Sequence, residues 1–293
     1  HIVIAGMGGS GAIGDMFASI LSKSKIHVNV VKGYTLPQTV DSNTLVIAIS
    51  VSGNTDETLS VLKSAHQFGC KIVAFSSGGK MKEYCEINEI NYKFVREYNS
   101  PRASFASYLY TILKVLYSTL EIKKDDILES IIELKKINKK INSSNLTNEN
   151  PALKLAESII GTPIIYFPFG LQSAAIRFKN SLQENSKIHA MIENIVETCH
   201  NGIVAWEKKS DMQPILIQGK NDFRKTEERW IIIKDYFEKN EITYNEIVSI
   251  NGNILSKLIN LIYILDYTSI YLAVKTKIDP SPVKSINFIK SKL

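Results

Sequence analysis

This sequence has few cysteines and no residues at the spacing of metal ligands. These absences argue against a fold held by disulfides and against one built around a metal ion. The 293 residues include three cysteines, an odd number with no Cys-x-x-Cys pair. We therefore expect reduced thiols in a cytoplasmic protein rather than disulfides or a zinc site. No set of His, Cys, Asp and Glu residues has metal spacing, because Cys199 and His200 are adjacent and poorly placed to chelate one ion. The sequence predicts neither a disulfide framework nor a metal site.

Long apolar runs and basic stripes are scarce as well. Only residues 254–274 approach membrane length, and Lys257 and Asp266 interrupt them, so a buried helix is expected. The net charge of +6 comes from lysines spread along the chain, without a basic stripe among aromatic residues. This pattern disfavours nucleic acid and membranes as partners and suits anionic substrates. No signal peptide precedes the first expected strand, and we expect residues before His1 to be missing.

The sequence does contain a regular alternation of short apolar runs and helical segments. Strands are expected at residues 2–5, 27–31, 45–49, 71–75, 92–95, 164–167, 215–218 and 244–250. In the second half, helices are expected at 172–184, 226–239 and 254–274. This alternation predicts an α/β fold with parallel, doubly wound sheets. The most polar, turn-prone run, residues 142–151, gives the best boundary, between domains at 1–145 and 146–293.

The loop at residues 50–55, Ser-Val-Ser-Gly-Asn-Thr, says most about function. Gly53 permits a tight turn, and Ser50, Ser52 and Thr55 bring three hydroxyls to the start of a helix. Free amides and the helix dipole favour an anion there. The loop holds no lysine or arginine, which suits a small sugar phosphate better than a nucleotide. The alternative is a plain capped helix with Thr55 or its neighbour as N-cap, but three hydroxyls exceed what a cap requires.

The glycine-rich turn at residues 6–11, Gly-Met-Gly-Gly-Ser-Gly, formally matches a dinucleotide-binding pattern. The acidic companion of that pattern is missing, because Lys32 follows the second strand. We therefore expect no nucleotide cofactor. In the competing interpretation, Gly8, Gly9 and Ser10 form a wall whose backbone lies close to a sugar.

The parallel sheet predicts where these polar residues meet. Ligands of doubly wound sheets bind at the carboxyl ends of the strands. That edge is expected to gather Ser10, Ser50, Ser52, Ser76 and Arg102.

The second half has its densest polar segment between residues 177 and 206. Glu184 closes an expected helix, where the dipole disfavours a negative charge and so suits a general base. His200 lies in a polar turn and can move protons near neutral pH. Most glutamates and loop histidines, however, are only solvated surface residues, and this alternative stays open for both.

Five motifs together carry a resemblance to a known family. They are, in chain order, GMGGSG at 6–11, SVSGNT at 50–55, PRA at 101–103, LQENSK at 182–187 and HNGIVAWE at 200–207. The chain resembles the bifunctional phosphoglucose/phosphomannose isomerases typified by archaea, which consist of two sugar-isomerase (SIS) domains with flavodoxin-like sheets. The resemblance spans the whole chain.

The resemblance implies an aldose–ketose isomerase without metal or other cofactor. Its substrates would be glucose 6-phosphate and mannose 6-phosphate, interconverted with fructose 6-phosphate through a cis-enediolate. The 6-phosphate would be bound by Ser50, Ser52 and Thr55. The sugar would be lined by Gly9 and Ser10.

The resemblance also assigns catalytic roles. Glu184 resembles the base that moves a proton between C2 and C1, and Arg102 resembles the cation that steadies the enediolate. His200 resembles the ring-opening histidine donated by the partner subunit of a homodimer. A lysine of the C-terminal helix assists; Lys290 matches best, with Lys284 and Lys292 as rivals.

Two positions depart from the family pattern. Val51 replaces an aromatic residue or serine, and the run Val-Glu-Thr-Cys at 196–199 replaces a Pro-Glu-Leu run, which could alter the loop of His200. Another SIS isomerase for a different ketose phosphate, a non-catalytic sugar-phosphate sensor and a dehydrogenase remain as alternatives. A sensor would need no base, so Glu184, Arg102 and His200 argue against it.

Overall fold

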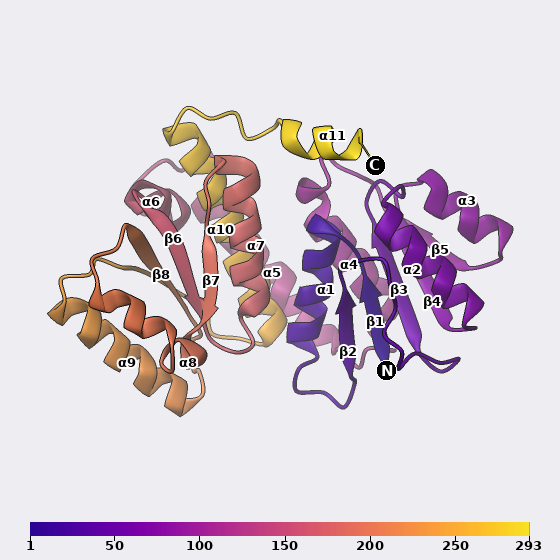
Figure 1. Cartoon of the computed structure of the whole chain (residues 1–293), viewed down its shortest axis with the longest axis horizontal. Coiled ribbons are helices and arrows are strands. Elements are labelled where there is room, and N and C mark those ends of the chain that lie inside the picture. Colours follow the sequence, from indigo (N-terminus) through magenta and orange to yellow (C-terminus); the bar gives the residue numbers. More distant parts are fainter. Residues whose placement is uncertain (293) are drawn as a thin grey trace. The chain divides into compact units, whose positions relative to one another are not determined.

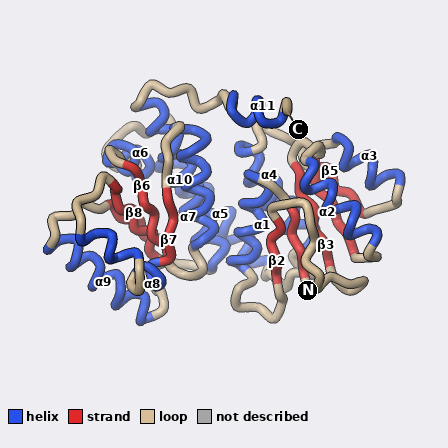
Figure 2. Tube along the Cα trace, in the orientation of Figure 1, coloured by secondary structure: helices blue, strands red, loops and turns tan. Residues whose placement is uncertain are grey.

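The computed structural model describes residues 1–292. Contacts divide the chain into two compact units, His1–Ile127 and Leu128–Leu293. In each unit a parallel sheet lies between helices, as Figures 1 and 2 show. The predicted α/β class with two doubly wound sheets is therefore confirmed. The boundary between residues 145 and 146 stays a prediction.

The first unit contains a five-stranded sheet in the order β2-β1-β3-β4-β5, with every neighbouring pair parallel. The chain order reverses between β1 and β3, the switch point at which such sheets bind ligands. The strands are β1 (Ile2–Ala5), β2 (Val28–Val31), β3 (Leu45–Ser50), β4 (Lys71–Ser76) and β5 (Asn91–Phe94). The helices are α1 (Gly8–Ile20), α2 (Asp56–Gln67), α3 (Gly79–Ile87), the 3-10 turn Arg102–Ser104 and α4 (Phe105–Leu116).

The first core explains why β3 is central. Val46, Ile47, Ala48 and Ile49 are fully buried because helices cover both faces of the sheet. On one face, α2 and α3 contribute Leu59, Leu62, Ala65, Met81 and Cys85 to the core. Figure 1 shows α1 and α4 on the other face. This packing fixes the carboxyl end of β3, from which the loop at residues 50–55 leaves.

The second unit repeats the arrangement with four parallel strands in the order β7-β6-β8-β9. The strands are β6 (Thr162–Phe167), β7 (Met191–Asn194), β8 (Met212–Gln218) and β9 (Asn245–Val248). Helix α5 (Lys124–Ile141) begins in the first unit and continues into the second. The other helices of the second unit are α6 (Pro151–Ser158), α7 (Gln172–Ser181), the π-turn Leu182–Ser186, α8 (Ile195–Thr198), the 3-10 turn Gly202–Glu207, α9 (Arg224–Lys239), α10 (Ile254–Lys275) and α11 (Lys284–Lys290).

Two sequence-based expectations about the second unit are wrong. The helix expected at residues 172–184 ends at Ser181, and the chain continues as a π-turn. Strand β7 was not expected, because this edge strand of mixed polarity leaves Met191 exposed and has no apolar run. Both features lie in the segment between Arg177 and His200.

Helix α10 is the buried helix that the sequence predicts. The Asn253 side chain caps it by accepting a hydrogen bond from the Ser256 amide at 2.9 Å. By length and composition α10 could cross a membrane, but 61% of its most apolar window is buried inside the structure, as in the core helix of a globular protein. Its contacts with α6 and α7 form one side of the second core.

Candidate active site

The loop between β3 and α2 holds its hydroxyls in a fixed arrangement. Ser50 is 1% exposed, and its Oγ lies 2.9 Å from Thr55 Oγ1 across the loop. The Gly53 amide donates to the same Ser50 oxygen at 3.1 Å. Ser52 is exposed at the tip, and its Oγ accepts from the Asn54 amide at 3.3 Å. The loop is thus organised by its own polar groups before any ligand arrives.

Gly53 fits this loop because no other residue would. Its φ of +70° is a conformation that L side chains rarely adopt, and an added Cβ would lie 1.8 Å from the carbonyl oxygen of Gly78. The loop after β4 is therefore locked against the loop after β3. Ser77 strengthens the contact, since its amide and its hydroxyl donate to Val51 O at 3.0 and 2.7 Å.

The start of α2 has the features of an anion site. Thr55 is the N-cap residue, yet within residues 1–292 its side chain accepts no hydrogen bond from the α2 amides. Its hydroxyl faces Ser50 instead. The Thr55 side chain therefore leaves the first-turn amides, at the positive end of the dipole, to other acceptors, although Asp56 and Glu57 place two carboxylates in the same turn. The alternative of a plain capped helix is disfavoured by this geometry.

The glycine turn after β1 and the Arg102 segment meet at the same edge of the first sheet. A Cβ built on Gly9 would lie 3.5 Å from Pro101 O and 3.8 Å from Arg102 Cα. One built on Gly6 would lie 3.0 Å from Ile49 O, next to the start of the β3–α2 loop. Ser10 is 5% exposed at the start of α1, and Arg102 is half-buried.

Ser76, which was expected at this edge, supports the neighbouring loop. It is fully buried at the end of β4, and its hydroxyl donates to Gly78 O at 2.9 Å. The carboxyl edge of the first sheet thus carries the predicted phosphate loop, the glycine wall and Arg102.

Glu184 lies in the π-turn that follows α7. The turn closes with Lys187 in a left-handed conformation, φ +57°, and its amide donates to Leu182 O. The Lys187 ammonium donates to Glu184 O and, at 3.4 Å, to Pro280 O in the segment before α11. Glu184 itself is half-buried, whereas its neighbours Asn185 and Ser186 are buried. π-turns inside helical segments are rare and frequently mark functional sites.

Glu184 and His200 are separated by strand β7. The π-turn precedes the amino end of β7, and His200 follows α8 beyond its carboxyl end, as Figure 1 shows for α7, β7 and α8. A strand of four residues spans about 13 Å. One copy of the second sheet therefore presents the two side chains at opposite edges. His200 is exposed, and its amide donates to Glu197 O at 2.9 Å.

Solvent exposure does not distinguish between the three candidate lysines near the C-terminus. Lys290 ends α11, Lys284 begins it, and Lys292 follows; all three are exposed. The assignment of Lys290 stays a prediction.

Sequence reasoning missed the polar residues of α10 that hold the Glu184 turn. Asp266 accepts from Arg177 Nε at 3.1 Å and from Ser181 Oγ at 2.6 Å, and Ser269 Oγ accepts from Asn185 Nδ2 at 2.8 Å. The available signal is the set of polar residues within a largely apolar helix. Of Asp266 and Ser269, Asp266 alone entered the sequence-based interpretation, as an interruption of a membrane-length run.

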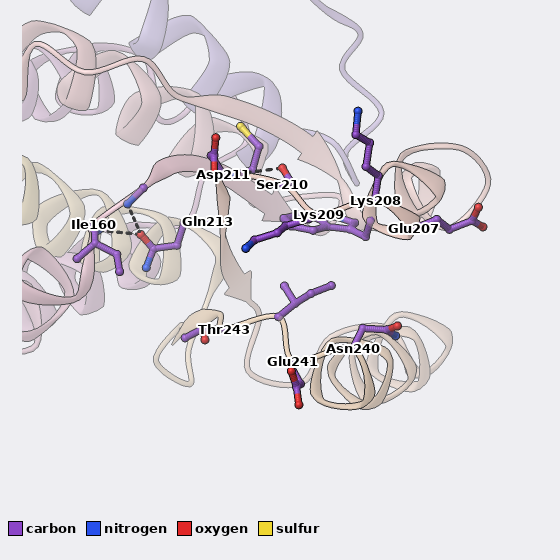
Figure 3. A pocket seen from close by; sticks show the side chains of 14 residues that line it. Ile160, Glu207, Lys208, Lys209, Ser210, Asp211, Gln213, Asn240, Glu241 and Thr243 are labelled. Carbon is purple, nitrogen blue, oxygen red and sulfur yellow. Dashed lines mark hydrogen bonds between the residues drawn. The ribbon is translucent and has the colours of Figure 1, made fainter.

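A cavity of about 830 Å³ lies at the amino ends of β6, β8 and β9, lined by residues 160–161, 206–213 and 240–243 (Figure 3). Its lining mixes charges, with Lys208 and Lys209 pointing in different directions and with Glu207, Asp211 and Glu241 also present. None of the predicted site residues lines it. The mixed charge gives this cavity no preference for an anion over a cation.

Two of the three thiols, Cys70 and Cys85, lie in the first unit and are disfavoured as nucleophiles. Burial raises the pKa of the Cys85 thiol to about 11, and burial also raises the pKa of Cys70. A raised pKa disfavours the thiolate, the form that acts as a nucleophile or metal ligand. Among residues 1–292, no group of three or more His, Cys, Asp and Glu residues is placed to hold a metal ion.

Comparisons with known proteins identify the family of the chain. The model of the SIS domain matches residues 1–88, and that of the bacterial phospho-glucose isomerase C-terminal SIS domain matches residues 148–293. A bifunctional phosphoglucose/phosphomannose isomerase of Caldicellulosiruptor bescii is 35% identical over 302 residues, covering 100% of this chain and 89% of that protein. The Aquifex aeolicus enzyme of the same name is 32% identical, covering 100% and 90%.

A solved structure shares the fold at much lower identity. A hypothetical protein of Thermus thermophilus superimposes with a TM-score of 0.80 at 14% identity, covering 99% of this chain and 82% of that one. The resemblance drawn from the five motifs is confirmed by the two full-length relatives. This chain belongs to the family of bifunctional phosphoglucose/phosphomannose isomerases.

Proposed function

We propose that this protein is an aldose–ketose isomerase that interconverts glucose 6-phosphate and mannose 6-phosphate with fructose 6-phosphate in the cytoplasm. The observation that carries the proposal is the β3–α2 loop, in which the Ser50 and Thr55 hydroxyls face each other at the start of α2 and the Thr55 side chain does not cap the helix. Hydroxyls and amides suit a compact sugar phosphate. The family to which the chain belongs has this activity in its name.

The substrate phosphate would bind to Ser50, Ser52 and Thr55, and the sugar would lie against Gly9 and Ser10. Hexose 6-phosphates are mostly closed rings, so an acid and a base must first break the hemiacetal. His200 and Lys290 are assigned to that step. Both side chains are exposed in the single chain, which is compatible with this role.

Proton transfer follows ring opening. Glu184 removes the proton next to the carbonyl group and returns it to the neighbouring carbon. Arg102 offsets the negative charge that develops on oxygen, an interaction that is strongest where water is excluded. Its place beside Gly9, at the edge that carries the phosphate loop, supports this role. Access to either face of C2 after rotation about C2–C3 would let glucose and mannose 6-phosphates share the site.

A homodimer is part of the proposal. The position of Glu184 and His200 beyond opposite ends of β7 supports the proposal that they serve one substrate from two different subunits. A second copy would supply the missing histidine. The exposure of His200 supports donation to another chain.

Mixed variants test the base and the dimer together. Glu184→Gln is expected to lower kcat for fructose 6-phosphate isomerisation by at least about 1000-fold, because the base is removed while the phosphate contacts remain. His200→Ala is expected to be impaired in ring opening. Hybrids of the two variants should regain activity, because one of their sites would combine an intact Glu184 with an intact His200. The measurement is coupled spectrophotometric turnover before and after subunit exchange.

Each negative outcome has a distinct meaning. Full turnover by Glu184→Gln would refute the base, and hybrids that stay inactive would refute donation of His200 between subunits. Saturable binding of hexose phosphate by the unaltered protein, without isomerisation, would identify a sensor instead. Preference for a pentulose or heptulose phosphate would identify another SIS isomerase.

A further inference from the structure

The turn that carries Glu184 is held from one side by a single residue of α10. Asn185 and Ser186, the residues that follow Glu184, are 6% and 2% exposed. The Asn185 amide donates to Ser269 Oγ at 2.8 Å, and the Ser186 hydroxyl donates to the Ser269 carbonyl at 2.6 Å. Ser269 has no exposed surface. Both contacts therefore lie in the interior, where an unpaired partner is unfavourable.

The Ser269 hydroxyl has no freedom to turn. It donates to the Asp266 carbonyl at 2.6 Å and accepts from Asn185, so its one proton and the facing lone pair are both assigned. Because the Ser269 hydroxyl is fixed, its acceptor lone pair determines the direction from which the Asn185 amide donates. The orientation of the turn is thereby tied to α10, whose sides facing α6 and α7 are buried.

The end of α7 is held by the same region of α10. The Arg177 guanidinium, 5% exposed, donates to the Asp266 carboxylate through Nε at 3.1 Å and through one terminal nitrogen at 2.8 Å. The Ser181 hydroxyl donates to the same carboxylate at 2.6 Å. A bidentate ion pair has a narrow range of geometries, and here the arginine is buried and the aspartate half-buried. Together with the Ser181 hydrogen bond, it fixes the last turns of α7 before the π-turn begins.

These contacts enclose Glu184 on both sides in the sequence. Ser181 precedes the π-turn, and Asn185 and Ser186 follow Glu184. A π-turn lacks the regular i to i−4 ladder of an α-helix, so side-chain contacts take over the task of fixing its direction. A base that serves two adjacent carbons needs such a fixed position, since a displacement of about 1 Å lowers turnover by about 100-fold.

We propose that Ser269, supported by Asp266, is a positioning residue for Glu184 in the isomerase reaction. It touches no substrate and acts through the hydrogen bond to Asn185. The proposal rests on the proposed function, in which Glu184 is the base.

Ser269→Ala tests the proposal. The variant deletes the acceptor of the Asn185 amide and leaves the first unit's phosphate loop unchanged. We expect kcat to fall about 10- to 100-fold while KM stays unchanged. Deuterium from solvent should appear in the product more often per turnover, because a loosely held base exchanges its proton before returning it. A change in packing alone would not raise this ratio.

The matched control is Thr268→Val, at the neighbouring position of α10. Thr268 is also fully buried, and its hydroxyl donates to Ile264 O within the helix at 3.0 Å. The isosteric substitution removes a buried hydroxyl without touching the Glu184 turn. Its kcat and deuterium ratio should equal those of the unaltered protein.

Asn185→Ala removes the donor of the same Asn185–Ser269 hydrogen bond. This variant tests the proposal if Ser269→Ala does not fold. It should reproduce the loss of kcat at unchanged KM, and the double variant should be no slower than either single one. Additive losses, or a Ser269→Ala enzyme with full kcat, would overturn the positioning role. Absence of turnover in the unaltered protein would instead refute the proposed function.

Discussion

Two loops at equivalent places in the two sheets differ in what fills them. In the orders β2-β1-β3-β4 and β7-β6-β8-β9, β8 takes the place of β3, so the loop after β8 corresponds to the loop after β3. The first loop holds facing hydroxyls on Ser50 and Thr55. The second holds a carboxylate, because Asp222 accepts from the Gly219 amide at 2.9 Å and from Trp230 Nε1 at 3.3 Å.

The comparison shows that the fold places a loop at the same position in both sheets, whereas the side chains of that loop determine which group it can bind. In the second loop the Asp222 carboxylate accepts the hydrogen bond of the Gly219 amide, so this amide does not face a bound anion. Burial is the main effect on Asp222 and raises its pKa, although the hydrogen bonds from Gly219 and Trp230 lower it. The first loop has no carboxylate between its hydroxyls, and its nearest carboxylates, Asp56 and Glu57, follow Thr55 in the first turn of α2.

The largest effect that would test this comparison is expected from Gly53→Ala. The new Cβ would fall 1.8 Å from Gly78 O at a φ of +70°, so the β3–α2 and β4–α3 loops must separate. We expect kcat/KM for fructose 6-phosphate to fall by more than about 100-fold. The free energy of unfolding should fall by about 2–4 kcal/mol.

Gly69→Ala is the matched control for strain. Gly69 has a φ of +68°, but its Cβ would meet no described atom within 4 Å. Its unfolding free energy should fall by about 1–2 kcal/mol with kcat/KM unchanged. Equal kinetic losses in the two variants would show that backbone strain, and not the arrangement of the phosphate loop, governs activity.

A smaller effect is expected from Ser50→Ala. The variant removes the hydroxyl that faces Thr55 and accepts from the Gly53 amide. Loss of one hydrogen bond to a charged phosphate, together with a looser loop, should raise KM for hexose 6-phosphates about 10- to 50-fold. The measurement is initial-rate kinetics with fructose 6-phosphate, with inhibition by inorganic phosphate as a second readout.

The corresponding control lies beside the second loop. Ser249 is 4% exposed, and its hydroxyl accepts from the Lys220 amide at 2.8 Å. Ser249→Ala should lower stability and leave KM unchanged. An equal rise of KM in both variants would remove the functional distinction between the two loops.

The smallest effect concerns the pH dependence of Asp222→Asn. Because folding raises the pKa of Asp222 above the ordinary value of 3.8, protonation stabilises the folded protein, and this contribution is lost as pH rises through the folded pKa. Asparagine stays neutral and keeps an oxygen for the Gly219 amide. The stability of the variant relative to the unaltered protein should therefore increase with pH across that window, by at most about 1 kcal/mol.

Urea unfolding at a series of pH values from about 3.5 upward, just below the ordinary aspartate pKa, would measure this difference. A difference that falls with pH would mean that hydrogen bonding, and not burial, dominates at Asp222. The second loop would then favour a bound negative charge after all.

The features that depend on local sequence patterns were predicted correctly. The buried strand at residues 45–49, the helix after it and the hydroxyl loop between them follow from hydropathy and turn chemistry, and the structure has all of them. Ser10 and Arg102 were predicted to lie at one edge because parallel strands place their carboxyl ends there, and Gly9, beside Ser10, does lie next to the Arg102 segment. The alternation of strands and helices and the content of the loops were enough to predict this proximity, while the roles of these residues stay predictions.

The second half was less predictable, because its features depend on partners distant in sequence. Asn185 and Ser186 are polar and so indicate a surface turn, yet they are buried by contacts with Ser269, more than 80 positions away. A π-turn differs from a helix end only in its hydrogen-bond spacing, which no residue pattern specifies. Strand β7 has too few apolar residues to stand out.

The backbone of Lys187 has a consequence for the evolution of this protein. A left-handed φ of +57° disfavours a lysine by about 1 kcal/mol and would suit glycine or asparagine. The lysine, however, links the backbone of Glu184 to Pro280 through its ammonium group. Selection for heat resistance alone would be expected to discard it, so this position is where thermostability and the integrity of the isomerase would be in competition.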